Sequence, residues 1–442
     1  MTRLVVVGAS LAGLRAVEAV RRDGFDGEVT LVGAEEHLPY DRPPLSKEYL
    51  AADESPDPRY REEATFAGDL DVELLLGTPA SGLDTRARTV RVGDRTVPYD
   101  GLVIATGAHA RTLPGTEGIE GVHTVRTLDD AVALRAALRG GASRLTVVGA
   151  GFIGSEVASV GRKLGLEVTI LEALETPLAR AVGERMGRAL THLHRRRGTE
   201  VRTGVAVDEV IAQEGDAAER SSTGRRGRVR AVRLADGTEV ATDVLVVGIG
   251  ARPATDWLEG SGLTLDDGVV ADETLAAAPG VYVAGDVARW PNALFGDVAG
   301  GTMRLEHWTS AAEQGGRAAR HAVDPASATP YETVPYFWSD WYDGRVQFVG
   351  IAAGDHVEVV AGDDAEGGPF TAIYRAGGRI VGALAVDMPA EVMKYRRLIG
   401  KRQSWDDALE LAEQRRRQRA EKAEKAEKAG QQQTADQQGA SA

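Results

Sequence analysis

Cysteine is absent from this 442-residue chain. A chain without cysteine forms no disulfide and offers neither a thiol nucleophile nor a thiolate ligand for zinc or an iron–sulfur cluster. Chemistry that cycles through a disulfide of this chain is therefore excluded. The same absence is consistent with a reducing compartment.

Long apolar runs are missing as well. No stretch reaches the about 18 consecutive apolar residues that a membrane-spanning helix needs, so no membrane partner is predicted. A strand-like segment begins already at Leu4, which leaves no room for a cleavable signal at the N-terminus. We therefore expect a cytoplasmic protein.

Positive charge is in deficit, with 52 lysines and arginines against 66 aspartates and glutamates and a net charge of −14. This balance argues against general binding to nucleic acid. Histidines are few, and their spacing from neighbouring acids is not that of metal ligands, so no metal site is predicted. We expect surface or packing roles for His37, His109, His192, His194, His307 and His321.

The chain begins with a strand–turn–helix pattern. Residues 4–7 are apolar and mostly β-branched, which predicts a strand buried on both faces. A glycine-bounded turn follows, and such a turn lets backbone N–H groups approach the pyrophosphate of a dinucleotide. Ser10 occupies the middle glycine position, so the match alone also suits an ordinary tight turn. The residues of this turn are Gly8, Ser10, Leu11, Ala12 and Gly13.

The pattern recurs near the middle of the chain with all three glycines, at Gly149, Gly151 and Gly154. A second buried strand, residues 168–171, ends in Glu172, where a carboxylate can accept hydrogen bonds from both ribose hydroxyls of an adenosine. Two such loops predict two dinucleotides in one chain. Hydride transfer from a nicotinamide to a flavin is the simplest reaction that joins them.

The first unit needs a ribose-binding acid of its own. Gly33 follows the strand predicted over residues 28–32, at the position where such an acid often ends the strand. Glu35 lies two residues later, and we assign the ribose to it, with Glu36 as the rival.

Three further stretches suit a cofactor site. Residues 39–47 combine stiff prolines with Arg42 and Lys47, which the loop would hold in place, although solvated cations on a structural turn are the alternative. A buried strand ends in small residues at 105–107, which let backbone pass close to a cofactor. Asp286 follows another strand, where we expect a helix to begin, as an N-cap or as an acceptor for a ribityl hydroxyl.

The second half of the chain changes in character. The polar stretch 213–228 predicts a hairpin insertion, and residues 304–308 are expected to open a helix. Aromatic residues gather near Trp338, and alternating strands follow to about residue 386, which predicts an α+β domain. We expect residues 414–442 to be a solvated helix that frays into disorder.

Taken in order over residues 3–400, these motifs resemble the FAD-dependent NADH:ferredoxin reductases that serve oxygenases, a group of the pyridine nucleotide-disulfide oxidoreductase superfamily that works without the disulfide. The group includes putidaredoxin reductase, rubredoxin reductase and the reductase components of aromatic-ring dioxygenases. The most specific matches are residues 42–47 and 105–107, the second glycine loop with Glu156, and residues 284–286 and 337–340.

The resemblance implies an α/β fold with two Rossmann-like dinucleotide-binding domains of the glutathione-reductase type and a C-terminal α+β domain. The implied FAD-binding domain is split between residues 1–115 and 251–325. The implied NAD-binding domain covers residues 116–250, the α+β domain covers 326–413, and a charged tail covers 414–442.

The resemblance also implies roles for single residues, with Ser10 and Ala34 as departures from the family pattern. The catalytic residues would be Lys47, near the reactive edge of the flavin, its partner Glu156, and Trp338 beside the flavin ring. FAD would contact Gly8, Ser10, Leu11, Ala12, Gly13, Glu35, Arg42, Lys47, Ala80, Ala105, Thr106, Gly107, Arg126, Gly285, Asp286 and Trp308. NADH would contact Gly149, Gly151, Phe152, Ile153, Gly154, Glu156, Glu172 and Gly250.

The implied activity is transfer of hydride from NADH to FAD, followed by single-electron transfer to a [2Fe–2S] ferredoxin or a rubredoxin-type carrier. That carrier would feed a haem-dependent monooxygenase or a Rieske dioxygenase. The alternatives on this scaffold are an NADH oxidase or quinone reductase, a monodehydroascorbate-type reductase, and an NADH-responsive signalling flavoprotein. We expect a monomer or a weak homodimer. The candidate docking cations are Arg304, Arg345, Lys394, Arg396 and Arg397.

Overall fold

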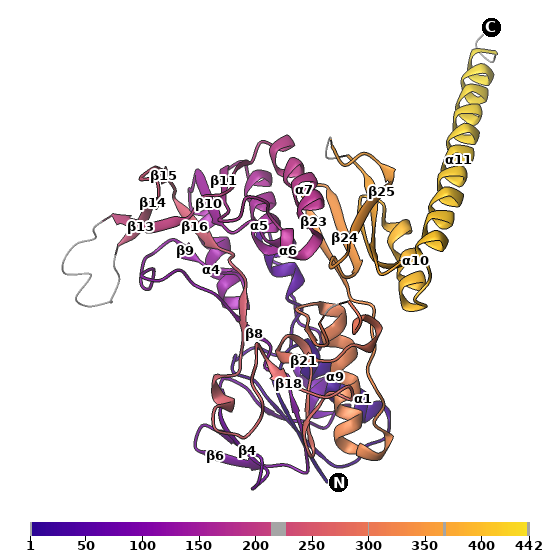
Figure 1. Ribbon diagram of the computed structural model, residues 1–442. Helices are drawn as coiled ribbons and strands as arrows, with labels where there is room; N and C mark the ends of the chain where they lie inside the picture. The colour runs from indigo at the N-terminus through magenta and orange to yellow at the C-terminus, as the bar shows by residue number, and fades with distance from the viewer. Residues whose placement is uncertain (1, 214–226, 299, 366–367, 440–442) are drawn as a thin grey trace.

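The computed structural model describes residues 2–213, 227–298, 300–365 and 368–439. Three large sheets organise these residues, two of them mainly parallel and one antiparallel. The first sheet lies in the lower part of Figure 1, the second in the upper left and the third in the upper right. This is the predicted α/β fold with an added α+β unit.

The first sheet has the strand order β19-β20-β7-β1-β2-β3 and places β1 at its centre, parallel to both neighbours. Helices α1 and α9 pack against each other beside it, and their apolar faces close one large core. The chain enters this sheet twice, before and after the second sheet. Its elements are β1 (Arg3–Val7), α1 (Leu11–Arg22), β2 (Glu28–Val32), β3 (Glu73–Leu75), β7 (Gly101–Ile104), β19 (Ala276–Ala278), β20 (Val281–Val283) and α9 (Trp308–Val323).

The second sheet is parallel, in the order β12-β11-β10-β16-β9. The predicted hairpin insertion begins and ends as a paired antiparallel ladder, in which Gln213 faces Arg228, and residues 214–226 lie outside the described part. The elements of this region are β9 (Val122–His123), α4 (Leu128–Arg139), β10 (Arg144–Val148), α5 (Phe152–Lys163), β11 (Glu167–Leu171), α6 (Ala179–Val182), α7 (Glu184–Arg196), β12 (Glu200–Arg202), β13 (Val207–Gln213), β14 (Arg228–Leu234), β15 (Glu239–Ala241) and β16 (Val244–Val247).

The third sheet is antiparallel, in the order β23-β24-β27-β26-β25, and has its own apolar core. Helix α10 packs on it, and α11 extends away from it at the upper right of Figure 1. We call these elements the C-terminal unit. They are β23 (Tyr336–Trp341), β24 (Gly344–Gly350), β25 (His356–Gly362), β26 (Phe370–Ala376), β27 (Arg379–Val386), α10 (Pro389–Gly400) and α11 (Trp405–Gly439).

Shorter elements connect the sheets. The two-stranded ladder of β8 with β17 carries the chain between the first and second sheets and returns it. The remaining elements are η1 (Pro43–Ser46), α2 (Glu48–Ala51), α3 (Glu63–Ala67), β4 (Ala80–Asp84), β5 (Thr89–Val92), β6 (Arg95–Pro98), β8 (Ala108–Ala110), β17 (Ala251–Pro253), η2 (Asp256–Leu258), β18 (Val269–Val270), η3 (Gly285–Val287), β21 (Ala288–Trp290), η4 (Ala293–Phe295), β22 (Met303–Arg304) and η5 (Pro325–Ser327).

Two helix starts were predicted at the wrong residues. Asp286 lies in a single 3-10 turn and not at the start of a helix, because β21 follows at once and pairs with β18 and β22. Arg304 belongs to strand β22, and the helix expected there begins only at Trp308, with His307 as its N-cap. Both errors come from strand pairing that a local sequence pattern does not reveal.

The tail forms the predicted helix, since α11 continues to Gly439, and residues 440–442 lie outside the described part. Its sequence is rich in alanine, glutamate, lysine and arginine and has no proline, which favours helix. Arg415 and Arg419 pair with Glu391 of α10, at 2.8 and 3.0 Å, so the start of the tail is bound to the C-terminal unit. Within the described residues, no helix has both the length and the apolar character needed to cross a membrane.

Candidate functional site

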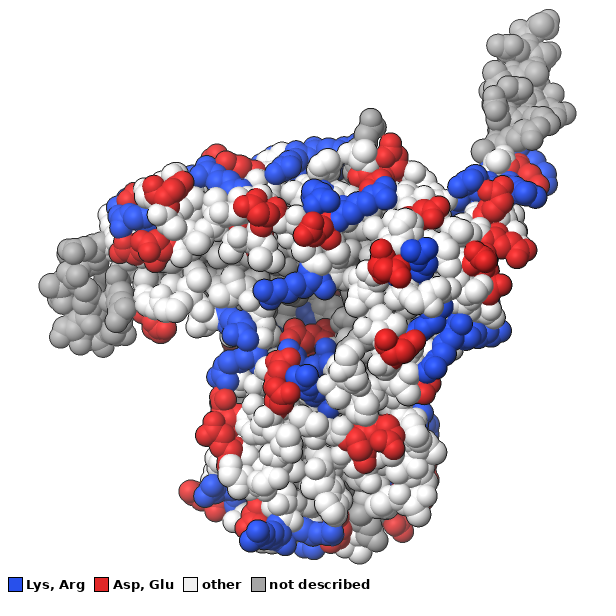
Figure 2. All heavy atoms as spheres, in the orientation of Figure 1, with Lys and Arg blue, Asp and Glu red and all other residues white. Residues whose placement is uncertain are grey.

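We call the first sheet with its helices the first unit and the second sheet with its helices the second unit. A cavity of about 810 Å³ lies where these two units and the C-terminal unit meet. Figure 2 shows the molecule hollowed between its lower and upper parts, with charged side chains of both signs around the opening. Residues from both glycine loops, from the proline-rich loop and from β23 line this cavity. The predicted site residues on its wall are Gly8, Ser10, Leu11, Ala12, Glu35, Arg42, Lys47, Ala80, Ala105, Thr106, Gly107, Arg126, Gly151, Phe152, Ile153, Glu156, Gly250, Gly285, Asp286, Trp308 and Trp338.

Four predicted site residues are not on this wall, and three of them are glycines that allow close packing behind it. A Cβ on Gly13 would lie 1.9 Å from the carbonyl oxygen of Gly8, and one on Gly154 would lie 2.1 Å from that of Gly149. Gly149 itself has φ +99° and would place a Cβ 2.4 Å from the oxygen of Gly248. These glycines therefore set the turn and the helix against the strand.

The fourth residue behind the wall is Glu172. Its Oε2 accepts a hydrogen bond from the Ala150 N–H at 2.8 Å, and its Oε1 accepts one from the Leu174 N–H at 2.9 Å. The carboxylate is thus fixed against its own glycine loop by backbone donors, and each oxygen keeps a lone pair for a further donor.

Ser10 is tolerated because the middle position of such a loop has room for a side chain. The corresponding Gly151 has φ −74°, and a Cβ there would lie no closer than 3.8 Å to another atom outside its own turn. Ser10 and Gly151 each cap the helix that follows, and the Ser10 hydroxyl accepts a hydrogen bond from Arg42 Nε at 3.2 Å.

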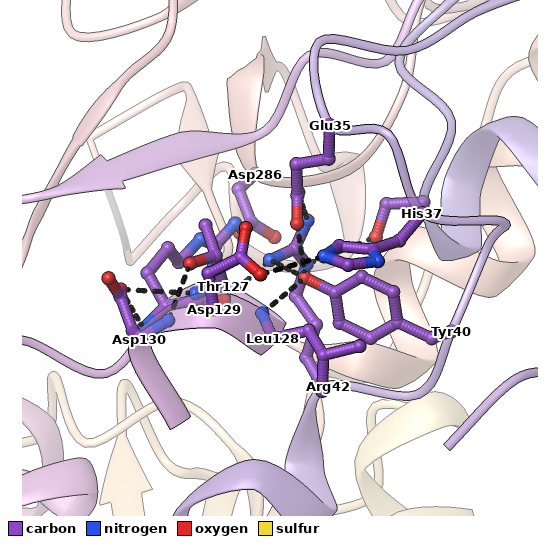
Figure 3. Close-up of polar contacts among 11 residues, drawn as sticks. Glu35, His37, Tyr40, Arg42, Thr127, Leu128, Asp129, Asp130 and Asp286 are labelled. Carbon is purple, nitrogen blue, oxygen red and sulfur yellow. Dashed lines mark hydrogen bonds and ion pairs between the residues drawn. The ribbon is translucent and has the colours of Figure 1, made fainter. Parts of the chain in front are cut away.

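Glu35, and not its neighbour Glu36, lies on the cavity wall. Its Oε1 is 2.7 Å from Nη2 of Arg42, whose side chain is about three-quarters buried at 23% exposed. Glu36 instead lies against Gly77. Figure 3 shows Glu35 and Arg42 beside Asp286, which pairs with Arg126 at 2.8 Å.

Lys47 and Glu156 form a buried ion pair at the centre of the site. The distance between Nζ and Oε2 is 2.7 Å, and the side chains are only 13% and 3% exposed. Lys47 also donates to the carbonyl oxygen of Pro43 at 2.9 Å. Removing one partner of a buried pair costs about 3–5 kcal/mol, since the other charge is left unpaired. The pair therefore holds the loop of the first unit against helix α5 of the second.

Two serines donate hydrogen bonds to Glu156, and sequence reasoning assigned a role to neither of them. Ser46 donates to Oε2 and Ser339 donates to Oε1, each at 2.5 Å. Ser339 comes from β23, so all three units meet at one carboxylate. The only signal in the sequence was their place inside the two motifs over residues 42–47 and 337–340.

Aromatic rings form one side of the cavity. Trp308 and Trp338 meet edge to face with 6.2 Å between ring centroids, and Trp308 Nε1 donates to Asp41 Oδ1 at 2.9 Å. His307, predicted as a packing or surface residue, also lies on this wall. Burial lowers the pKa of His307 to about 4, so its ring is neutral at pH 7. Its buried Nδ1 has no hydrogen-bond partner among the described residues.

A second buried histidine joins helix α7 to the C-terminal unit. His194 contacts the Tyr342 hydroxyl at 2.7 Å and the Ser155 hydroxyl at 3.0 Å, and its ring stacks on Trp341. Burial lowers the pKa of His194 to about 4. Because Ser155 precedes Glu156 on α5, these contacts hold β23 against the helix that carries the ion pair.

The predicted docking cations are largely neutralised by neighbours. Arg304 is not a surface cation, because its side chain is 13% exposed and pairs with Asp267 and Glu306. Arg345 pairs with Asp340 at 2.5 Å and Arg396 lies 3.7 Å from Glu313. Arg397 is exposed and Lys394 partly so. Among the described residues no group of three or more potential ligand side chains could hold a metal ion.

Two glycine-loop sheets that share one cavity define a class, the proteins that bring two dinucleotides together. The chain belongs to the pyridine nucleotide-disulphide oxidoreductase family, which matches residues 2–315, and it carries a reductase C-terminal domain over residues 336–419. The predicted family and fold class are thereby confirmed, and FAD and NAD(H) are the cofactors of this family.

Relatives match almost the whole chain. It is 36% identical over 400 residues to a ferredoxin–NAD(P)+ reductase from Sphingomonas sp, covering 90% of this chain and 92% of the relative. It is 35% identical over 411 residues to the ferredoxin–NAD+ reductase component of the p-cumate 2,3-dioxygenase system of Pseudomonas putida, covering 92% and 95%. A chain of the covalent putidaredoxin reductase–putidaredoxin complex superimposes with TM-score 0.82 at 31% identity, covering 91% and 93%.

Proposed function

We propose that this chain is an NADH:ferredoxin reductase, which oxidises NADH through bound FAD and reduces a [2Fe–2S] ferredoxin or a rubredoxin-type carrier that feeds an oxygenase. The observation that carries the proposal is a single cavity whose wall includes both glycine loops, with the Lys47–Glu156 pair between them. The ferredoxin reductases among its relatives support the same activity.

The residues present suit FAD in the first unit. Gly8 has φ +123°, and a Cβ there would lie 2.1 Å from the carbonyl oxygen of Ala105, so only glycine leaves room for this turn. The start of α1 then offers free N–H groups to a pyrophosphate. In this proposal Glu35 accepts from the adenosine ribose and Asp286 from the ribityl chain, and both residues lie on the cavity wall. When bound, FAD accepts two electrons from NADH and gives them up singly.

Lys47, at the centre of the site, acts through its positive charge. Lys47 is held by Glu156 and Pro43, so its ammonium is a fixed positive charge that needs no rearrangement during the reaction. Such a charge in a water-poor site stabilises negative charge that grows in the transition state. Trp308 and Trp338 give this part of the cavity an apolar wall.

In the second unit, Glu172 gives the preference for NADH over NADPH. A carboxylate at the end of this strand bonds a 2′-hydroxyl and repels a 2′-phosphate. The type of electron carrier, the oligomeric state (a monomer or a weak homodimer) and the cytoplasmic location stay predictions from the sequence.

The test is NADH-dependent reduction of cytochrome c, measured with and without a [2Fe–2S] ferredoxin. We expect slow reduction by the purified yellow protein alone and a steep rise when ferredoxin is added. Docking through cations such as Arg397 and Lys394 predicts that this rate falls as salt rises, while ferricyanide reduction changes less. Rapid turnover of a quinone with no stimulation by any ferredoxin would replace the proposal with a quinone reductase.

A further inference from the structure

We infer that Tyr40 is a positioning residue of the FAD site, which orients Glu35 for the adenosine ribose and ties it to the second unit. The inference rests on the proposed function, because it takes Glu35 as the anchor of the ribose. The sequence offered no reason to single out Tyr40, whose ring is buried at 3% exposed. Figure 3 shows its hydroxyl between Glu35, Arg42 and Leu128.

The hydroxyl of Tyr40 has three partners, which use its full hydrogen-bonding capacity. It lies 2.5 Å from Glu35 Oε2, 3.0 Å from Arg42 Nη1 and 2.9 Å from the backbone nitrogen of Leu128. A phenol has one proton to donate and two lone pairs to accept with. Since the arginine and the backbone nitrogen are both donors, the phenol proton is directed to Glu35.

The protonation state of this phenol is fixed as well. Burial raises the pKa of Tyr40, so the hydroxyl keeps its proton at any pH at which the protein works. The Tyr40 ring also lies beneath the Arg42 guanidinium, 5.0 Å from ring centroid to Cζ. A tyrosine at this position therefore supplies a permanent donor and a platform for the arginine.

Glu35 receives one donor on each carboxylate oxygen, Tyr40 on Oε2 and Arg42 on Oε1. Two donors on separate oxygens fix the plane of the carboxylate and leave lone pairs on both oxygens. Because Glu35 lies on the cavity wall, those lone pairs are available to two neighbouring hydroxyls such as those of a ribose.

The third partner of Tyr40 links this anchor to the second unit. Leu128 is the first residue of helix α4, and its N–H is one of the donors that a helix leaves unpaired at its start. Arg42 makes a parallel link through the carbonyl oxygen of Arg126 at 2.5 Å. The adenosine end of the FAD site is thereby joined to α4, the helix between β9 and β10 of the second sheet.

The experiment is a double-mutant cycle on FAD affinity in the full-length protein. Tyr40→Phe and Glu35→Gln are made singly and together, and the dissociation constant of FAD is measured from flavin fluorescence as holoprotein is diluted. A hydrogen bond to a charged group predicts that Tyr40→Phe weakens FAD by about 10-fold in the unmutated background. In the Glu35→Gln background the same change is expected to have less than about 2-fold effect, since its target has lost its charge.

Tyr99→Phe is the matched control, because Tyr99 is another tyrosine of the first unit, 1% exposed, whose hydroxyl has no partner among the described residues. It should leave FAD affinity unchanged.

Equal effects of Tyr40→Phe in both backgrounds would overturn the inference, and so would unchanged FAD affinity in either single variant. In those cases ferredoxin-dependent turnover by the unmutated protein would leave the proposed function standing. Failure of the unmutated protein to bind FAD would instead remove the proposed function and the inference with it.

Discussion

The first and second dinucleotide units share a strand, a glycine turn and a helix, yet they support their acids in different ways. In the second unit Glu172 directly follows its strand and is held by the backbone N–H groups of Ala150 and Leu174. In the first unit Gly33 follows the strand, and Glu35 is held by two side chains of the same segment, Tyr40 and Arg42. The first unit therefore holds its acid with side-chain donors, where the second uses backbone N–H groups.

The turns themselves also differ at the middle glycine position, and this difference separates two roles of glycine. The first and third glycines of each turn have no room for a Cβ, as Gly8 and Gly149, Gly13 and Gly154 show. The middle position has room, and the chain places serine there in the first unit. The outer glycines thus serve the fold, and the middle one serves the approach of a ligand.

The largest effect is expected where the two units meet. Lys47→Ala should slow the reduction of bound FAD by NADH about 100-fold, because a preorganised charge that stabilises the transition state is lost. NADH binding should weaken much less, since the charge acts mainly on the transition state. Stopped-flow measurement at saturating NADH tests this, with exposed Lys401→Ala as the control. An unchanged limiting rate would show that Lys47 only shapes its loop.

Glycine variants test the steric part of the comparison. Gly154→Ala should destabilise the protein by about 1–3 kcal/mol, because its Cβ would press on the carbonyl oxygen of Gly149. Gly151→Ala, three residues away, has room and should leave the free energy of unfolding nearly unchanged. Denaturant unfolding compares the two, and equal losses would contradict the assignment of roles.

The two acids test whether the two units bind different dinucleotides. Glu172→Ala should narrow the preference for NADH over NADPH by about 10-fold, because the 2′-phosphate is no longer repelled. Glu35→Ala is the matched variant in the other unit, and it should weaken FAD while the coenzyme preference stays the same. The measurement is the ratio of kcat/KM for NADH and NADPH in each variant. A change of this ratio in Glu35→Ala would mean that Glu35 also contributes to the NADH site, contrary to the assignment.

The smallest effect is expected at the middle of the first turn. Ser10→Gly removes one hydroxyl that accepts from Arg42, a bond of 3.2 Å, and should change FAD affinity by less than about 3-fold. A much larger loss, measured by fluorescence on dilution, would mean that the serine is itself a main contact of the cofactor.

Local patterns in the sequence were enough for the central strands of the first two sheets and for the two glycine turns. Glu35, chosen over Glu36 for the ribose, lies on the cavity wall, and its role stays a prediction. The Lys47–Glu156 pair came from the family resemblance, and the structure brings these two residues together.

Contacts between distant segments were beyond the sequence. Ser46 and Ser339 reach Glu156 from 110 and 183 residues away along the chain, and no local spacing encodes such a meeting. The same holds for Tyr40, whose partner Leu128 lies 88 residues later.

The central claim is that two dinucleotides meet in this one cavity and that electrons pass from NADH to FAD there. It is tested most directly by mixing the purified holoprotein with NADH or with NADPH in a stopped-flow instrument without oxygen. The account predicts rapid bleaching of the flavin band by one equivalent of NADH and much slower bleaching by NADPH. A protein that carries FAD but keeps its oxidised spectrum in the presence of NADH would contradict it.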